Sequence, residues 1–286
     1  MSARPSLDAA REAAIRAAFP DVFRPRLAAR AAHVALAVAA AALFAFSLYW
    51  LDFSFERFAR GVARLGQFVV LMLPPNAGGD LSLYLRSLAD TFAIAVLGTA
   101  LGALVAAPFG FLAAKNIVPN AIFHFSLRRF VDCARSIDIL IWALIWVGVV
   151  GLGPFAGVLA IASADFGAFG KLFSETIEAA ETRAIEGVRA AGGDRAAEIR
   201  FGLLPQILPV LAGQILYFLE TNVRAAMVLG VVGAGGVGLH LSEQIRLLEW
   251  PRVAVLILLL LVSVAALDRL SEWARRRLIS GEEQRL

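Results

Sequence analysis

The segment SETIEAAETRAIEGVRAAGGDRAAEIRFGLLP (Ser174–Pro205) is the longest polar stretch in a chain that is otherwise rich in apolar residues. Ser174 is expected to cap a helix with an acidic first turn, and Gly192–Gly193 to end that helix in a left-handed conformation. Asp194 follows the glycines and is expected to cap a second, short helix. The segment therefore predicts two helices that meet at a sharp glycine corner.

The chain on both sides of this segment has the composition of a membrane protein. Of the 286 residues, 59% are hydrophobic and 17% are charged, and the mean hydropathy is +0.74, which departs from ordinary globular usage. A helix needs about 20 apolar residues to cross a hydrocarbon core of about 30 Å. Six stretches, taken with their flanks, meet this need: 31–50, 87–114, 137–150, 154–171, 205–232 and 253–267. We therefore predict an all-α integral membrane protein with six transmembrane helices, in which the polar segment lies between the fourth and the fifth.

The distribution of Lys and Arg predicts the orientation, because basic residues near helix ends are retained in the cytoplasm. With both termini inside, 20 of the 27 basic residues lie on the cytoplasmic side and six on the external side. Arg224 then lies within the fifth span. Since most of the basic charge lies in cytoplasmic loops, the pI of about 9.8 gives no reason to expect nucleic-acid binding.

These spans divide the chain into five parts. They are a cytoplasmic N-terminal amphipathic segment (1–30), a first transmembrane helix (31–50), an external segment with an interfacial helix (51–80), a core of five spans (81–270) and a cytoplasmic tail (271–286). The interfacial helix is expected to end before Pro74 and Pro75.

No metal-ligating or catalytic set of residues is evident in the sequence. The three histidines are far apart and have no metal-ligand spacing, and Cys133 is the single cysteine, which excludes an intrachain disulfide. Asp90, Asp138 and Asp165 are interpreted as helix caps or interfacial groups near membrane boundaries. We therefore expect the chain to perform no covalent chemistry and to bind no metal.

The second half of the polar segment resembles the EAA loop of ABC-importer permeases, whose pattern is E-A-A, three residues, Gly, nine residues, Ile, one residue, Leu-Pro. The residues that match are Glu186, Gly192, Leu204 and Pro205, and those that depart are Gly187, Val188 and Gly202. Four ordered blocks resemble phosphonate ABC transporter permeases: GLGPFAGVLA (151–160), KLFSETIEA (171–179), LPQILP (204–209) and RAAMVLGVVGAGGVGLHL (224–241). The chain is thus similar to the transmembrane subunit of a type I ABC importer, in the same superfamily as the methionine permeases, over roughly residues 80–270.

The resemblance implies ATP-driven import of phosphonates or related phosphorus oxyanions, such as phosphate and phosphite, by a permease dimer in the bacterial cytoplasmic membrane. The implied partners are a second copy of the chain, two ABC ATPase subunits that bind ATP and Mg, and a periplasmic or extracellular phosphonate-binding protein. The sequence agrees, since it lacks the G-x-x-x-x-G-K-[ST] phosphate loop. No cofactor is expected on this chain, and it is not expected to be an enzyme.

Two alternatives to this function remain. A methionine or other amino-acid importer is the alternative within the superfamily, and the extra first span and Arg224 disfavour it. A membrane-embedded enzyme or a proton-coupled carrier is the alternative outside the superfamily, and it would be active without any ATPase partner.

The EAA-type loop contains seven candidates for contact with the ATPase subunits: Glu186, Gly192, Gly193, Asp194, Arg195, Glu198 and Arg200. An ordinary solvated face is the alternative for these charges, because charges on a cytoplasmic helix usually face water. However, a short helix that is braced by glycines at one end and by a proline-started span at the other is suited to transmit rigid-body motion. We therefore favour a coupling helix at this place.

The stretch VVGAGGVG (Val231–Gly238) contains the G-x-G-x-x-G pattern of dinucleotide-binding turns. The residues before it form a membrane span and not a strand, so the context that this pattern needs is missing. Glycine permits close backbone approach and positive φ. Gly233, Gly235, Gly236 and Gly238 are therefore predicted to pack at an outer gate across the dimer axis, and a plain external turn is the alternative.

Arg224 is a candidate substrate ligand, because a guanidinium inside a span is costly and usually faces an aqueous path or the bundle interior. Its planar fork matches the oxygens of a phosphonate, and Asn222 is expected to add a neutral contact. Glu220 lies one helical turn earlier, in the orientation that favours an i,i+4 ion pair. A structural salt bridge between Glu220 and Arg224 is therefore the alternative to a substrate path.

Overall fold

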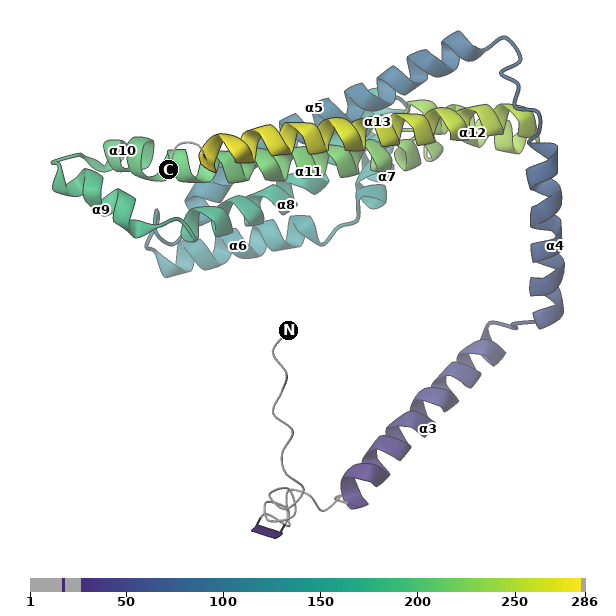
Figure 1. Cartoon of the computed structure of the whole chain (residues 1–286), viewed down its shortest axis with the longest axis horizontal. Coiled ribbons are helices and arrows are strands. Elements are labelled where there is room, and N and C mark those ends of the chain that lie inside the picture. The colour runs from purple at the N-terminus through teal and green to yellow at the C-terminus, as the bar shows by residue number, and fades with distance from the viewer. Residues whose placement is uncertain (1–16, 19–26, 284–286) are drawn as a thin grey trace. The chain divides into compact units, whose positions relative to one another are not determined.

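The computed structural model describes residues 17–18 and 27–283, and every element of secondary structure in these residues is a helix (Figure 1). The helices are α3 (Leu27–Trp50), α4 (Phe55–Leu71), α5 (Leu81–Ala113), α6 (Ala121–Arg135), α7 (Ile139–Val150), α8 (Pro154–Glu178), α9 (Thr182–Ala190), α10 (Arg195–Ala197), the π-helix η1 (Glu198–Leu203), α11 (Leu204–Val231), α12 (Val237–Arg246) and α13 (Trp250–Glu283). The chain divides into two units, Met1–Gln67 and Phe68–Leu286. The predicted N-terminal segment 1–30 lies almost entirely outside the described residues.

The first unit contains α3, which is apolar along its length. Residues 31–50 have a mean hydropathy of 2.1, and none of them is buried within the chain, so α3 matches the predicted first span in length and apolarity. The helix predicted before Pro74 and Pro75 is also present as α4. It carries an exposed apolar stripe of Phe55, Phe58, Val62 and Leu65, and its interfacial position stays a prediction.

In the second unit, small residues let α5 and α8 pack closely and in parallel. A Cβ atom built at Gly98 would lie 2.6 Å from Ile161 Cβ, and one built at Gly110 would lie 2.6 Å from Phe173 Cβ. Both pairs are 63 positions apart in sequence, so the two helices run in the same direction along this contact. Close approach over small residues is a common way for helices to pack in membranes.

Helices α6 and α7 form a bent pair that passes the length and apolarity test for a span only when the two are taken together. α7 has only 12 residues, about 18 Å at 1.5 Å per residue, which is too short to cross about 30 Å of hydrocarbon. α6 packs antiparallel to α8, with Val131 against Gly170 and Arg135 against Gly167, and the axes of α6 and α7 differ by 83°. α7 alone, within the predicted span 137–150, is therefore too short to cross. The described residues contain five helices long and apolar enough to span a membrane, and the predicted six if the bent pair counts as one span.

The fourth span is longer than predicted. α8 extends to Glu178, which is seven residues beyond the predicted end at Lys171, so Ser174 lies inside this helix. The Ser174 side chain is buried and its hydroxyl donates to the carbonyl of Lys171 at 2.8 Å. The prediction that Ser174 caps a cytoplasmic helix was therefore wrong, and that helix, α9, begins at Thr182.

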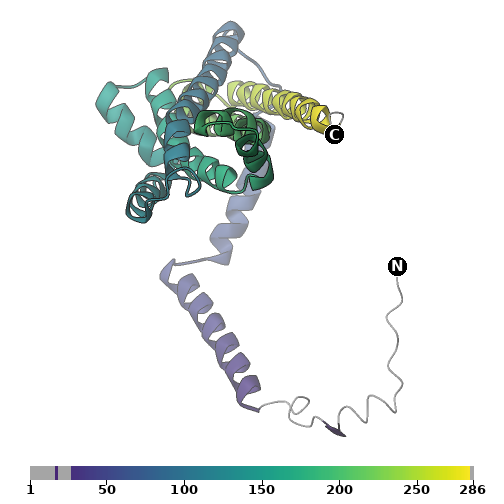
Figure 2. The same cartoon turned by 90° about the vertical axis from the view of Figure 1, so that its left-hand side faces the viewer.

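The second unit has two distinct ends. The C-terminal ends of α5 and α8 and the start of α11 share one end with α9, α10 and η1 (Figure 1), and we call this the coupling end. The opposite end holds the starts of α5 and α8 and the connection Val232–Gly236 between α11 and α12, which we call the glycine loop. Figure 2, turned so that the coupling end faces the viewer, shows α6 and α13 on opposite sides of this unit.

Candidate functional site

The predicted glycine corner is present at the coupling end. Gly192 follows α9 with a φ of +85°, the left-handed conformation that favours glycine. Asp194 caps the next turn, since its Oδ1 atom accepts from the backbone N–H of Ala197 at 2.8 Å. Gly193 has an ordinary φ and is needed for space instead, because a Cβ there would lie 2.7 Å from Val188 Cγ1. Sequence therefore located this corner and its cap correctly.

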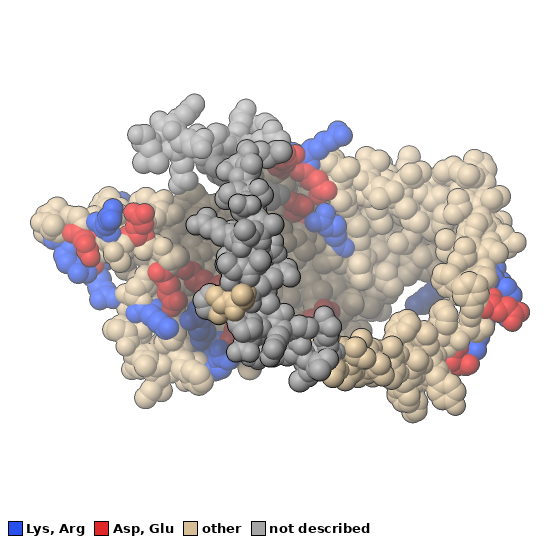
Figure 3. Space-filling model, turned by 60° about the horizontal axis from the view of Figure 1, so that its bottom comes forward, with Lys and Arg blue, Asp and Glu red and all other residues tan. Residues whose placement is uncertain are grey.

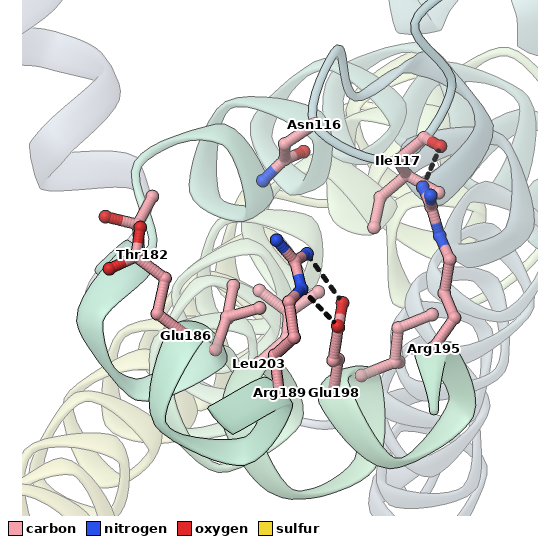
Figure 4. A pocket seen from close by; sticks show the side chains of 10 residues that line it. Asn116, Ile117, Thr182, Glu186, Arg189, Arg195, Glu198 and Leu203 are labelled. Carbon is pink, nitrogen blue, oxygen red and sulfur yellow. Dashed lines mark hydrogen bonds and ion pairs between the residues drawn. The ribbon is translucent and has the colours of Figure 1, made fainter. Parts of the chain in front are cut away.

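An ion pair joins the two arms of the corner (Figure 4). Arg189 donates from Nε to Glu198 Oε1 at 2.7 Å and from Nη2 to Glu198 Oε2 at 3.1 Å, which is the fork geometry that makes such pairs strong. The hydrogen bond from Arg189 lowers the pKa of the Glu198 carboxyl, and the bond to Glu198 raises the pKa of Arg189. The sequence analysis named Glu198 but missed Arg189, because only the corner brings residues nine positions apart into contact.

A cavity of about 200 Å³ lies between this corner and the α5–α6 connection (Figure 4). Arg195 spans its edge and donates to the carbonyl of Ile117 at 2.7 Å. Asn116, Thr182 and Glu186 also line the cavity. The coupling end therefore offers a polar recess, and Arg195 is bound to the body of the unit.

The departure of Gly202 from the EAA pattern has a structural reason. A Cβ atom at Gly202 would lie 2.9 Å from Ile185 Cα, so the backbone of α9 lies directly against η1 at this point. Ile185 packs beside the buried cluster of Ala114, Ile177, Leu203 and Ile207. The EAA pattern has an isoleucine at the position of Gly202. In this chain the isoleucine that packs against the cluster is Ile185, which comes from α9.

Charged side chains gather over the coupling end. Figure 3 shows Lys, Arg, Asp and Glu side chains over the α9 and α10 region, beside a surface that is largely uncharged. Arg200 is exposed there, with its guanidinium carbon 5.4 Å from the centre of the Phe201 ring. Such a patch fits contact with another polar protein surface better than contact with lipid.

At the opposite end, the four predicted gate glycines are all buried within the single chain. Gly233, Gly235 and Gly236 have φ values of +95°, +81° and +72°. The carbonyl of Gly233 accepts from Gly153 N–H at 2.9 Å, and Thr91 Oγ1 accepts from Val237 N–H at 2.9 Å. The loop is thus fixed to the start of α8 and to α5.

Gly238 must lack a side chain for a different reason, because a Cβ atom there would overlap the carbonyl of Met227 on α11. These close approaches lie within one chain, and contact across a dimer axis stays a prediction. The glycine loop connects two helices, so the exclusion of a dinucleotide-binding turn agrees with the fold.

Arg224 forms the predicted pair with Glu220, at 3.1 Å, and a second pair with Asp268 of α13, at 3.4 Å. The side chains of Arg224 and Asp268 are 46% and 45% exposed, and that of Glu220 is 15% exposed. Asp268 was missed because it lies 44 positions away in sequence. One guanidinium is thus shared by two carboxylates, on a half-open face of two candidate spans.

Asn222 lies on the other side of α11, and it is buried. Its side-chain N–H groups donate to Asp165 Oδ2 at 2.6 Å and to Thr99 Oγ1 at 2.8 Å. In this conformation the amide therefore faces the interior of the chain, which differs from the expected contact with substrate. Asp165 lies in the middle of α8 and is 3% exposed, so its interpretation as a cap or interfacial group was wrong. Asp138 does cap its helix, accepting from Leu140 N–H at 2.8 Å.

Among the described residues, no group of three or more His, Cys, Asp and Glu side chains is arranged to hold a metal ion. The structure therefore has a helical membrane unit with a charged coupling end and a fixed glycine loop. Between them lie two groups of polar side chains, one around Arg224 and one around Asn222. This arrangement matches a known family.

Residues 106–280 match the family described as binding-protein-dependent transport system inner membrane component. The chain belongs to this family. It is the transport permease component of an ABC system, a multi-pass inner membrane protein, and the ATPase of such a system is a separate subunit.

Several relatives of this permease are named for the transport of phosphorus oxyanions. It is 35% identical over 258 residues to HtxC of Stutzerimonas stutzeri, a candidate phosphite transport system permease. The alignment covers 90% of this chain and 91% of HtxC. It is 38% identical over 211 residues to the phosphate-import permease PhnE of Mycolicibacterium smegmatis, over 73% of this chain and 39% of PhnE.

The permease fold is also known from solved structures. An inward-facing structure of the MetNI methionine ABC transporter matches with a TM-score of 0.61 and 23% identity, over 69% of this chain and 97% of the other. At this identity the match shows the fold alone. It confirms the predicted type I importer architecture.

Proposed function

We propose that this permease is the membrane-spanning subunit of an ATP-driven importer for phosphonates or related phosphorus oxyanions such as phosphite and phosphate. The observation that carries the proposal is the 35% identity with HtxC over nine-tenths of both chains. A methionine or other amino-acid importer shares the fold, but the likeness to MetNI supports no substrate.

We propose that two copies of the chain assemble with two ATPase subunits, which bind ATP and Mg, and with an external binding protein. The coupling end supports the ATPase contact, because its exposed charges and its recess lie on a helix pair fixed to the ends of α8 and α11. The contact residues proposed there are Glu186, Gly192, Gly193, Asp194, Arg195, Glu198 and Arg200. The gate residues proposed at the other end are Gly233, Gly235, Gly236 and Gly238.

The coupling end is proposed to face the cytoplasm together with both termini. Single cysteines at Asn76 and Glu243, in a Cys133→Ala background, are expected to react with an impermeant reagent outside intact cells. A cysteine at Asp194 is expected to stay unlabelled. Labelling at Asp194 would reverse the orientation.

Arg224 is proposed to face the substrate path, with Glu220 as its constant partner. A half-exposed charge in a membrane span requires a polar environment, so the face that carries Arg224 is expected to border water or a second copy rather than lipid. Asp268 occupies part of the guanidinium fork in this conformation. A passing oxyanion would replace Asp268, and we assign Asn222 to helix packing instead of the path.

Reconstitution tests the function. The permease, its ATPase and the cognate binding protein are placed in proteoliposomes, and uptake of labelled methylphosphonate, phosphite, phosphate and methionine is measured with ATP. Uptake of a phosphorus oxyanion that depends on ATP and on the binding protein is the expected result. Uptake of methionine alone would support the amino-acid alternative, and uptake without the ATPase would support a carrier.

A further inference from the structure

Three polar side chains from three helices meet in the interior of the second unit. Thr99 of α5, Asp165 of α8 and Asn222 of α11 are 1%, 3% and 4% exposed. The Asn222 amide is the shared donor, at 2.8 Å to Thr99 Oγ1 and 2.6 Å to Asp165 Oδ2. We call these three residues the polar cluster.

The surroundings of the polar cluster are apolar. Buried residues on the glycine-loop side include Ala95, Ile161 and Val223, and buried residues on the coupling side include Ala103 and Phe169. In such an interior a polar group without a partner is costly. The hydrogen bonds of the cluster are therefore expected to persist whenever these three helices move.

Helices α5 and α8 also pack closely at this level. A Cβ atom at Gly102 would lie 2.7 Å from Asp165 Cβ, so α5 lies directly against the residue that accepts from α11. Short distance and buried hydrogen bonds thus coincide at one point. Among the described residues, no three or more His, Cys, Asp and Glu side chains are arranged to hold a metal ion. The three side chains of the cluster are buried, so a substrate does not reach them in this conformation.

The position of the polar cluster along the chain connects it with coupling. Along the chain, α8 comes directly before the helices α9, α10 and η1 of the coupling end, and α11 comes directly after them. Asp165 lies 13 residues before the end of α8, and Asn222 lies 18 residues after the start of α11, or about 20 and 27 Å at 1.5 Å per residue. On α5, Thr91 lies about two turns from Thr99 toward the glycine loop. Its hydroxyl accepts from the N–H of Val237, the residue that follows this loop.

We propose that Thr99, Asp165 and Asn222 are positioning residues that make α5, α8 and α11 move as one body. A displacement of the coupling end then reaches the glycine loop through α5 and Thr91. The inference rests on the proposed coupling function but not on the substrate. Its signature is loss of transport per ATP hydrolysed, in a complex that still assembles.

The test exchanges the two partners. Asn222→Asp removes the amide donor and places two carboxyl groups opposite each other. Asp165→Asn combined with Asn222→Asp restores one amide and one carboxyl with their positions reversed. Asn76→Asp is the matched control, because Asn76 Oδ1 only accepts from Gly78 N–H and an aspartate keeps that oxygen. Each complete transporter is reconstituted in proteoliposomes, and phosphite uptake and ATP hydrolysis are measured together.

Asn222→Asp is expected to lower the phosphite transported per ATP by about tenfold, the scale of one lost buried hydrogen bond. The double variant is expected to recover to within about threefold of the wild type, given the usual scatter of such couplings. A double variant no better than Asn222→Asp, or an Asn222→Asp permease with wild-type coupling, would overturn the proposal.

If Asn222→Asp does not assemble, the pair Thr99→Val and Thr99→Ser decides, because only serine keeps the accepting hydroxyl. Thr99→Val is expected to lower the phosphite transported per ATP relative to Thr99→Ser, and equal ratios would overturn the proposal. A wild-type complex that moves no phosphorus oxyanion would refute the proposed substrate alone. The cluster would then be tested by the stimulation of ATP hydrolysis on addition of binding protein, with the same variants and the same expected order.

Discussion

The coupling end and the membrane interior of this permease use similar polar partners in opposite settings. Arg189 and Glu198 form a forked ion pair at the coupling end, where the Glu198 side chain is 14% exposed but the Arg189 side chain is 66% exposed, so water and salt reach the guanidinium and weaken the attraction. Thr99, Asp165 and Asn222 make hydrogen bonds in an apolar interior, where the loss of one partner leaves a costly group. An exposed ion pair usually contributes little to stability, so the fully charged contact is expected to affect this fold less than the buried hydrogen bonds. Packing and buried hydrogen bonds set the helix positions, and the Arg189–Glu198 pair adjusts a loop.

Gly102→Ala is expected to have the largest effect on stability. Its Cβ would lie 2.7 Å from Asp165 Cβ and 3.2 Å from the carbonyl oxygen of Ala162, so α5 and α8 must separate, at about 1 to 3 kcal/mol. Thermal unfolding of the purified complex measures this. Gly213→Ala is the control, because nothing lies within 4 Å of its Cβ position. Equal melting temperatures for the two variants would show that the α5–α8 contact tolerates an added methyl group as readily as the open position at Gly213.

Gly192→Val is expected to have the next effect, and to change coupling more than insertion. A β-branched residue at φ +85° is strained, at about 1 to 3 kcal/mol, and the corner between α9 and α10 would open. Association with the ATPase, or its stimulation, should fall while the permease still enters the membrane. Gly187→Val, in α9 with open space around its Cβ position, is the control. Wild-type transport and ATPase coupling in Gly192→Val would show that this corner is not the coupling element.

Arg224→Gln separates a substrate role from a structural one. Removal of the guanidinium takes the Arg224 ion pair from the Glu220 carboxylate, which is 15% exposed, so stability is expected to fall by about 1 to 3 kcal/mol. Glu220→Gln combined with Arg224→Gln is expected to restore stability but not phosphonate transport. Thermal unfolding and uptake in proteoliposomes give the two results. Full recovery of transport in the double variant would remove Arg224 from the substrate path.

The sequence was sufficient for features that depend on local chemistry. The glycine corner and the Asp194 cap follow from residue types at neighbouring positions, and the Glu220–Arg224 pair follows from the helical repeat. Apolar length located the five candidate spans that single helices provide. These features need no knowledge of how the helices pack.

The features that sequence missed depend on contacts between distant segments. Asp268 reaches Arg224 across 44 positions, and Asp165 was interpreted as a boundary residue because α8 was taken to end at Lys171. Since α8 continues to Glu178, Asp165 lies at its middle and meets Asn222. A buried carboxyl whose partners come from other helices carries no local signal, so only the packing of α5, α8 and α11 identifies it.

The smallest expected effect is the pH dependence of the Arg189–Glu198 pair. The hydrogen bond from Arg189 lowers the pKa of Glu198 in the folded chain, so this pair contributes stability above the ordinary glutamate pKa of 4.5. That contribution is lost as the pH falls through the lowered folded value, because protonated Glu198 no longer attracts the guanidinium. Glu198→Gln should therefore melt slightly below the wild type at pH 7, and the difference should shrink toward zero in acid. High salt should reduce the same difference at pH 7, since the Arg189 side chain is 66% exposed. A difference in melting temperature that stays constant from pH 7 into acid would show that Glu198 stabilises the fold through packing and not through its charge. The ion pair at the coupling end would then no longer contrast with the buried polar cluster.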